Sequence, residues 1–283
     1  MYLIRKRQLG DVVWIEPIIR KLSLKHNKLI VHTKYNEIFK HNNYKNVFFK
    51  DKLNFFEKIF IYVDKILQTN LFSINLDGVY EQDTQKHILH AYQKFANLPI
   101  ENIYPSIQFS KEEELLNLVD KDKYAIIHIE SFSSRNYRNI FDVEWGIVAK
   151  KLNEMGYHVI QVGKNNQNIP NTSFLRTSIR DLMILIKKSS LFIGIDSFPS
   201  HLAAIFKIPS LIFFGAINPD YRHFRDQFNG KFLQNYCEFL GCYHSSKNGK
   251  EVSCVLVGDF GKPKCSVFET NFITQEIDNL IKN

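Results

Sequence analysis

The chain alternates short apolar segments with longer amphipathic ones, and this alternation limits its possible folds more than any other feature. Strands that alternate with helices favour parallel sheets wound through right-handed crossovers. A charged run at 111–122 predicts a helix and a linker between two such units. In the first unit we predict strands at 2–6, 28–33, 58–62 and 72–76, and helices at 11–24 and 87–96.

The second half repeats the pattern and completes an α/β prediction of two Rossmann-like domains facing a cleft, at 1–118 and 119–283. Sheets of this kind bind ligands beyond the carboxyl ends of their strands, so functional residues are expected there. Predicted strands lie at 124–129, 158–162, 191–195 and 210–214, and predicted helices at 145–155, at 179–188, from Pro199 onward and at 268–282.

The composition indicates where in the cell the protein is located and which classes of partner it can bind. With 283 residues, 45% of them hydrophobic, the chain can bury two cores. No apolar run approaches the roughly 20 residues of a membrane span, and the charges at the N-terminus follow the apolar residues, unlike a signal peptide. We therefore expect a cytoplasmic protein. The net charge of +8 leaves open a phosphorylated substrate, peripheral contact with an anionic inner membrane, or a basic surface without a partner. Lysines and arginines are scattered, which argues against nucleic acid.

Gly10 and Asp11 lie at the first strand-to-helix turn. Gly10 permits a tight turn, and Asp11 suits the N-cap of the following helix. A carboxylate at the end of a strand can also act as a general base, and both interpretations stay open. Pro17 lies inside the predicted helix, where it removes the hydrogen bond to Val13, so we predict a kink.

The segment 194–201 predicts an anion site. The apolar strand ends in Asp196 and Ser197, and Pro199 suits the first turn of a helix, whose free amides and dipole attract anions. Ser200 and His201 could donate to a phosphate or a sugar. The alternative is an ordinary helix start.

Two further loops follow predicted strands. Gly163 and Lys164 end a strand and could line a nucleotide pocket. The other loop places hydroxyls and guanidinium groups where a diphosphate would accept hydrogen bonds, although a solvated loop is the alternative. Its candidate residues are Ser133, Ser134, Arg135 and Arg138.

All four cysteines fall within the segment 237–265. Four thiolates suit a tetrahedral zinc or an iron centre, and disulfides are disfavoured in a cytosolic protein. We expect either a structural metal or unpaired thiols. The candidate ligands are Cys237, Cys242, Cys254 and Cys265.

In this order the motifs resemble the ADP-heptose:lipopolysaccharide heptosyltransferases, glycosyltransferase family 9. The family has a Gly-Asp turn and a helix with an early proline, here Gly10-Asp11 and Pro17. It also has the pattern Asp-Ser/Thr-Gly-x-x-His-Leu-Ala-Ala before a proline and an apolar strand, here 196–204 and 209–215. Phe198 stands where the family has Gly.

The resemblance implies a GT-B fold and inverting transfer from a nucleotide-diphosphate sugar, with an ADP-linked heptose favoured. It implies an acceptor-binding first domain with Asp11 as base, a donor-binding second domain, and no catalytic metal. The expected acceptor is a bacterial surface glycan such as the lipopolysaccharide core, and a lipid-linked glycan or a protein is the alternative. Members that modify autotransporter proteins carry an iron-binding four-cysteine finger. Rival functions are a GT-B epimerase or hydrolase and a catalytically silent binding subunit.

Overall fold

The computed structural model describes residues 1–67, 71–82, 84–131, 138–245, 254–258 and 261–282. The chain forms two compact units, Met1–Glu114 and Leu115–Asn283. Each unit has its own parallel sheet and is described by itself.

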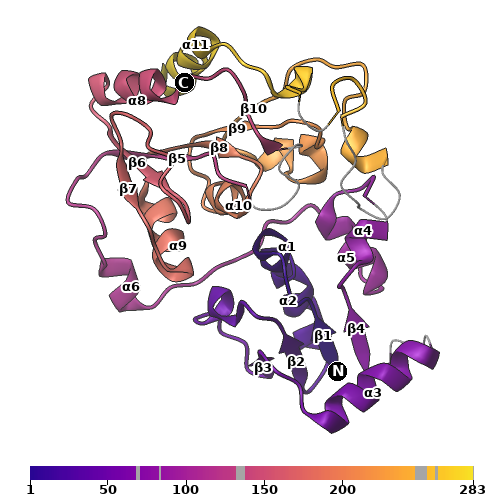
Figure 1. Ribbon diagram of the computed structural model, residues 1–283. Helices are drawn as coiled ribbons and strands as arrows, with labels where there is room; N and C mark the ends of the chain where they lie inside the picture. The colour runs from indigo at the N-terminus through magenta and orange to yellow at the C-terminus, as the bar shows by residue number, and fades with distance from the viewer. Residues whose placement is uncertain (68–70, 83, 132–137, 246–253, 259–260, 283) are drawn as a thin grey trace. The chain divides into compact units, whose positions relative to one another are not determined.

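Unit 1 contains a four-stranded parallel sheet in the order β3-β2-β1-β4 (Figure 1). Its strands are β1 (Tyr2–Ile4), β2 (Leu29–His32), β3 (Val47–Lys50) and β4 (Ser73–Asn75). The chain runs outward from β1 to β3 and then returns to pair β4 with the other side of β1. The strand order therefore reverses between β1 and β4, which makes their carboxyl ends the expected site of ligand binding.

The single helix predicted at 11–24 is two helices, α1 (Leu9–Val13) and α2 (Glu16–Lys25). Pro17 causes the break, because it has no amide hydrogen for the carbonyl of Val13 and is tolerated only in a first turn. It lies in the first turn of α2. The N-cap of α1 is Gln8 rather than Asp11, which lies inside the first turn.

The strand predicted at 58–62 was wrong, because this segment lies inside the helix α3 (Phe55–Leu67). A run of apolar residues on both sides of Lys58 hid the helical period. The remaining helical elements of unit 1 are η1 (Asn36–Phe39), α4 (Val79–Gln82), α5 (Ile88–Phe95) and α6 (Lys111–Leu115).

Unit 2 contains a six-stranded parallel sheet in the order β10-β9-β8-β5-β6-β7. When β5 is taken as the first strand of the unit, this is the doubly wound strand order of dinucleotide-binding folds. The order reverses between β5 and β8. The edge strands β7 and β10 were not predicted, because their half-exposed residues form no apolar run. The strands are β5 (Tyr124–His128), β6 (His158–Val162), β7 (Ser173–Leu175), β8 (Leu191–Ile195), β9 (Ser210–Phe213) and β10 (Gly230–Leu233).

Helices cover both faces of this second sheet, with α8 and α11 on one side and α9 and α10 on the other (Figure 1). Residues of α8 and α11 pack with strand residues such as Ile127, Ile193 and Phe213 in one continuous core. The predicted α/β class with parallel sheets is confirmed. Within the described ranges, no helix has both the length and the apolar character needed to cross a membrane. The four helices that cover the second sheet are α8 (Trp145–Glu154), α9 (Ile179–Lys188), α10 (Phe198–Ile205) and α11 (Thr270–Lys282).

Candidate functional site

Asp11 is held by a buried arginine at the point where the first sheet reverses its order. Arg5 directly follows β1, and its Nη2 donates to the carboxylate of Asp11. The Arg5 side chain is 3% exposed and that of Asp11 is 19% exposed, so the guanidinium is buried and the carboxylate remains accessible. This geometry orients the predicted base toward the surface of unit 1.

Two further carboxylates surround the same guanidinium. Asp77, just beyond β4, lies 3.7 Å from Arg5 Nη1, and Glu81 lies 3.4 Å from Nη2. Burial lowers the pKa of Arg5, but Tyr92 and the three carboxylates reverse this and raise it above its ordinary value. The prediction did not include Arg5 or Glu81; a charged residue directly after a buried strand is the signal that could have found Arg5.

In unit 2, Asp196 is a buried carboxylate between two arginines. It follows β8, and its Oδ2 lies 3.3 Å from Arg138 Nε and 3.5 Å from Arg222 Nε. Burial raises the pKa of Asp196, but Arg138, Arg222 and the nearby histidines lower it to about 2. The carboxylate thus lies between the two guanidinium groups and balances part of their positive charge. The sequence predicted Asp196 and Arg138 but not Arg222.

Unit 2 contains two buried histidines beside this cluster, His201 and His223, and a third, His128, beside Ser197. His201 in α10 and His223 have ring centroids 4.9 Å apart. Burial lowers the pKa of His201 well below its usual range. Burial also lowers the pKa of His223 to about 4, although Asp196 opposes this shift. It lowers the pKa of His128 to about 4 as well, against the opposing effect of Glu130. All three rings are therefore neutral at pH 7.

Ser197 and Ser200 begin α10. Ser197 Oγ donates to the carbonyl of Ile195 at 3.0 Å and lies 3.1 Å from His128 Nδ1, at the end of β5. The Ser197 amide donates to Ser200 Oγ at 3.0 Å, and Ser200 Oγ donates to the Ser197 carbonyl at 2.7 Å. Both hydroxyls thus fix the first turn of the helix, where amide groups and the helix dipole favour an anion.

Gly163 and Lys164 lie at the end of β6 and are bound by Glu130, which follows β5. The Lys164 amide donates to Glu130 Oε2 at 2.6 Å. A Cβ atom on Gly163 would lie 2.8 Å from the same oxygen, so a larger residue here would displace the Glu130 carboxylate from this position. The two loops are therefore joined by one carboxylate, which sequence reasoning did not identify.

The predicted donor residues Ser133, Ser134 and Arg135 lie outside the described residues. Phe198, where the family has glycine, is the first residue of α10 and is 7% exposed. Its φ is not in the left-handed region, so the backbone at this position does not demand glycine.

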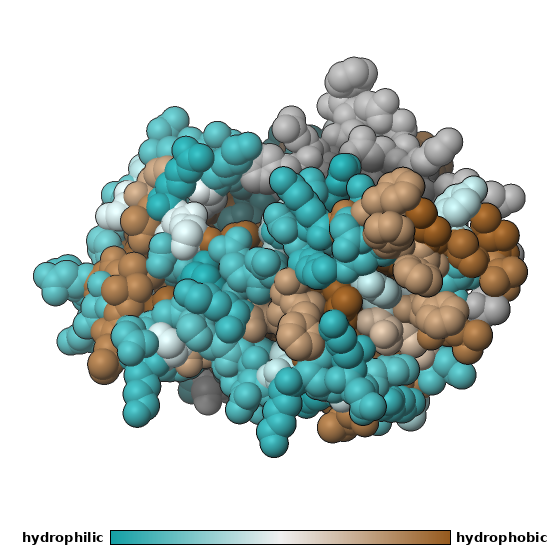
Figure 2. Space-filling model, turned by 90° about the horizontal axis from the view of Figure 1, so that it is seen from below, coloured by the Kyte–Doolittle hydropathy of each residue, from teal (hydrophilic) through white to brown (hydrophobic). Residues whose placement is uncertain are grey.

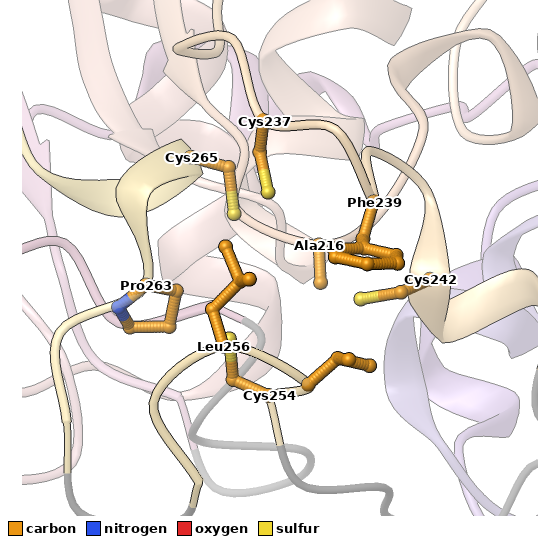
Figure 3. Close-up of a pocket in the computed structure, with 9 residues that line it drawn as sticks. Ala216, Cys237, Phe239, Cys242, Cys254, Leu256, Pro263 and Cys265 are labelled. Atoms are coloured by element: carbon orange, nitrogen blue, oxygen red, sulfur yellow. The ribbon is translucent and has the colours of Figure 1, made fainter.

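The four cysteines line one small cavity of about 10 Å³ (Figure 3). Their sulfur atoms point into it, and Leu256 projects into the same space. Cys237 and Cys265 are buried, and all four thiols are free. Burial raises the pKa of Cys265 to about 11, with a smaller contribution in the same direction from the other three cysteines.

These residues fit a metal in their chemistry. Four sulfur donors around one cavity are the ligand set of structural zinc and of iron–sulfur-type sites. Within the described ranges, no group of three or more Cys, His, Asp or Glu side chains is arranged to hold an ion as it stands. A metal would therefore have to draw the four sulfur atoms together and displace their protons, including those of Cys242 and Cys265, whose pKa values are raised.

Comparison with known proteins identifies the family. The sequence profile of glycosyltransferase family 9 (heptosyltransferase) matches residues 70–237, more than half of the chain. The curated proteins contain no match.

Several solved structures share the fold. The iron-containing dodecameric glycosyltransferase TibC from enterotoxigenic Escherichia coli has a TM-score of 0.76 at 16% identity, over 99% of this chain and 76% of that one. The E. coli ADP-heptose heptosyltransferase II has a TM-score of 0.65 at 14% identity, over 99% and 98%. E. coli WaaC with ADP has a TM-score of 0.60 at 11% identity, over 99% of both chains. The predicted GT-B fold is confirmed.

The buried histidines make the stability of unit 2 depend on pH. His128 has a folded pKa of about 4, below the unfolded value of about 6.5, so the unfolded chain binds the proton first and stability falls as pH drops through this interval. We expect His128→Gln to reduce the loss of unfolding free energy between pH 7 and 4.5 by about 2 kcal/mol, measured by urea denaturation at each pH. The matched control is His158→Gln on β6, and an unchanged slope in His128→Gln would contradict this assignment.

Proposed function

Because the chain belongs to glycosyltransferase family 9, we propose that it transfers a heptose from ADP-heptose, with inversion, to a bacterial surface glycan such as the lipopolysaccharide core. The observation that carries this proposal is the Arg138–Asp196–Arg222 cluster beside the first turn of α10. It combines fixed guanidinium groups with a helix N-terminus, as the leaving diphosphate of a sugar donor requires.

The donor would bind to unit 2. Its diphosphate would accept hydrogen bonds from Arg138 and from the amides at the start of α10, and neutral His201 would donate to a phosphate or sugar oxygen. The loops at Gly163 and Glu130 would line the nucleotide. Bound ADP and an ADP-heptose in related structures support an ADP-linked donor.

Asp11 would act as the general base from unit 1. The acceptor hydroxyl attacks the anomeric carbon, its proton passes to Asp11, and the bond to the β-phosphate oxygen breaks with its electron pair on ADP. Attack on the face opposite ADP inverts the anomeric configuration. Arg5 orients the carboxylate through its hydrogen bond, which leaves the other carboxylate oxygen for the proton. This step uses no catalytic metal.

A protein acceptor is the second candidate. The observation that favours it is the four-cysteine cavity, because this segment resembles the finger of the autotransporter-modifying members, and a structurally similar glycosyltransferase contains iron. Whether the acceptor is a glycan or a protein, we propose that the four cysteines hold a structural zinc or iron; the ligands are Cys237, Cys242, Cys254 and Cys265. The metal would connect η4 (Cys242–Ser245) to η6 (Lys264–Ser266) and would contribute to the free energy of folding.

A nucleotide panel tests the donor assignment. We expect ADP to raise the melting temperature more than UDP or GDP does, because a ligand that binds only the folded chain stabilises it. Arg138→Gln should weaken ADP binding by about 10-fold or more, since it removes a charge-assisted hydrogen bond. Arg176→Gln, an exposed arginine of the same unit, is the control. No stabilisation by any nucleotide would favour a catalytically silent subunit.

Substitution of Asp11 tests the base. Asp11→Asn should lower the rate of heptosyl transfer by about 10²- to 10⁴-fold, because the amide cannot take the acceptor proton, while the ADP-induced melting shift stays unchanged. Glu101→Gln removes a carboxylate from another ion pair of unit 1, with Lys21, and serves as control. Unchanged transfer by Asp11→Asn would exclude this role.

Metal analysis tests the cysteine site. Protein expressed with added zinc or iron should contain about one metal ion per chain, and Cys254→Ser should lose it and melt at a lower temperature. After chelation and denaturation, wild-type protein should show four titratable thiols. A metal content near zero in the wild type would leave the cysteines as unpaired thiols.

A further inference from the structure

Helix α3 presents its apolar side chains outward and its acidic side chains inward, the reverse of an ordinary surface helix. Its 13 residues, FFEKIFIYVDKIL, contain two carboxylates two turns apart, Glu57 and Asp64. Residues at this spacing share one face of a helix. Both are buried, at 6% and 2% exposure.

Both carboxylates attach α3 to its unit by specific contacts. Glu57 pairs with Lys50 of β3 at 2.5 Å and accepts from the Asn54 amide at 2.8 Å. Asp64 accepts from the amides of Leu71, Phe72 and Ser73 at 3.1, 3.3 and 2.7 Å, and from the Ser73 hydroxyl at 2.7 Å. The two carboxylates therefore hold α3 on its unit through these polar contacts. Burial of apolar side chains contributes little, because most of the apolar side chains of α3 are exposed.

The outward face is a large apolar surface. Of the 24 large apolar side chains that are exposed among the described residues, eleven fall within 48–72. Scattered exposed apolar residues are normal, but a contiguous patch marks a site of interaction. Figure 2 shows hydrophobic residues gathered in the region of α3. We call this set the α3 patch: Phe48, Phe55, Phe56, Ile59, Phe60, Tyr62, Val63, Ile66, Leu67, Leu71 and Phe72.

A groove of about 340 Å³ adjoins the α3 patch; its charged lining consists of Lys28 and the Lys50–Glu57 ion pair, so Lys28 gives it a net positive charge. Phe56 and Phe60 line it from the helix, and Lys28 and Lys50 line it from the sheet. Lys28 Nζ is exposed and lies 5.5 Å from the centre of the Phe48 ring. Residues 28–67 contain eight lysines against four acidic residues, two of which are the buried Glu57 and Asp64. Next to the patch, the exposed charges are Lys28, Lys52 and Lys58 against Asp51, so they are predominantly basic.

We propose that the α3 patch is a membrane-binding surface that inserts into the interface of a bilayer rich in anionic phospholipid. Aromatic and aliphatic side chains beside exposed lysines are the composition of helices that lie in a membrane surface. Thirteen residues are too few to span a bilayer, which requires about 20. A second copy of the chain is the other candidate, but the exposed Lys28 and Lys58 complement an anionic lipid surface better than they complement another chain of net charge +8.

Vesicle co-sedimentation tests this proposal in the absence of nucleotide. Wild-type protein should bind vesicles of phosphatidylglycerol and phosphatidylethanolamine at least 10-fold more tightly than vesicles of phosphatidylcholine. The double variant Phe56→Ser/Phe60→Ser should lower binding to the anionic vesicles by at least 10-fold. Lys28→Glu/Lys58→Glu should remove the preference for anionic lipid. The matched control is Leu24→Ser, 83% exposed on α2 of the same unit, which should bind as the wild type does.

Three results would overturn the proposal. These are absence of wild-type binding to anionic vesicles, equal loss of binding in Leu24→Ser, and concentration-dependent self-association of the wild type that Phe56→Ser/Phe60→Ser abolishes. The last result would assign the patch to a second copy. ADP-induced melting shifts on the same samples show that each variant is folded, and they report on the proposed transferase function separately from lipid binding.

Discussion

The pairing of β5 with β8 is the contact on which the geometry of the arginine cluster and the start of α10 depends. These strands are not consecutive in the chain, and their register sets His128 opposite Gly194. A Cβ atom on residue 194 would lie 2.7 Å from the His128 carbonyl oxygen, so the two backbones can approach this closely only at a glycine. The approach brings His128 to Ser197 and thereby fixes the start of α10 and the position of Asp196.

Unit 1 has the same kind of reversal in strand order, but the charges gathered there have the opposite sign. There the order reverses between β1 and β4, and one buried guanidinium, Arg5, is surrounded by Asp11, Asp77 and Glu81. In unit 2, two guanidinium groups surround one carboxylate. An excess of carboxylates suits removal of a proton from a neutral hydroxyl, whereas an excess of guanidinium groups suits an anionic diphosphate. The proposal that unit 1 binds the acceptor and unit 2 the donor is thus supported by charge as well as by family membership.

Much of the fold could be predicted, because the central strands are buried runs that stand out in the sequence. The apolar segments 124–129 and 191–195 are examples, and β5 and β8 lie there. The edge strands β7 and β10 could not be found this way, since their residues are partly exposed and mixed in polarity, and β3 was missed because its apolar run is only three residues long and partly exposed. Among the candidate residues, local motifs indicated Asp11 in unit 1 and Asp196 and His201 in unit 2. Arg5, Glu130 and Arg222 were missed because their importance comes from partners distant in sequence.

The error at α3 has a physical cause that bears on its role. Hydrophobic periodicity indicates a helix when one stripe is apolar and the opposite stripe is polar. In α3 the polar stripe consists of Glu57 and Asp64, and most other positions are apolar, so the segment resembles a buried strand. A helix of this composition would be expected inside a core, where its apolar residues would be covered. Here specific hydrogen bonds to buried carboxylates hold the helix at the surface of its unit, with its aromatic side chains exposed. Apolar exposure on this scale costs solubility, and burial in a lipid interface would offset that cost.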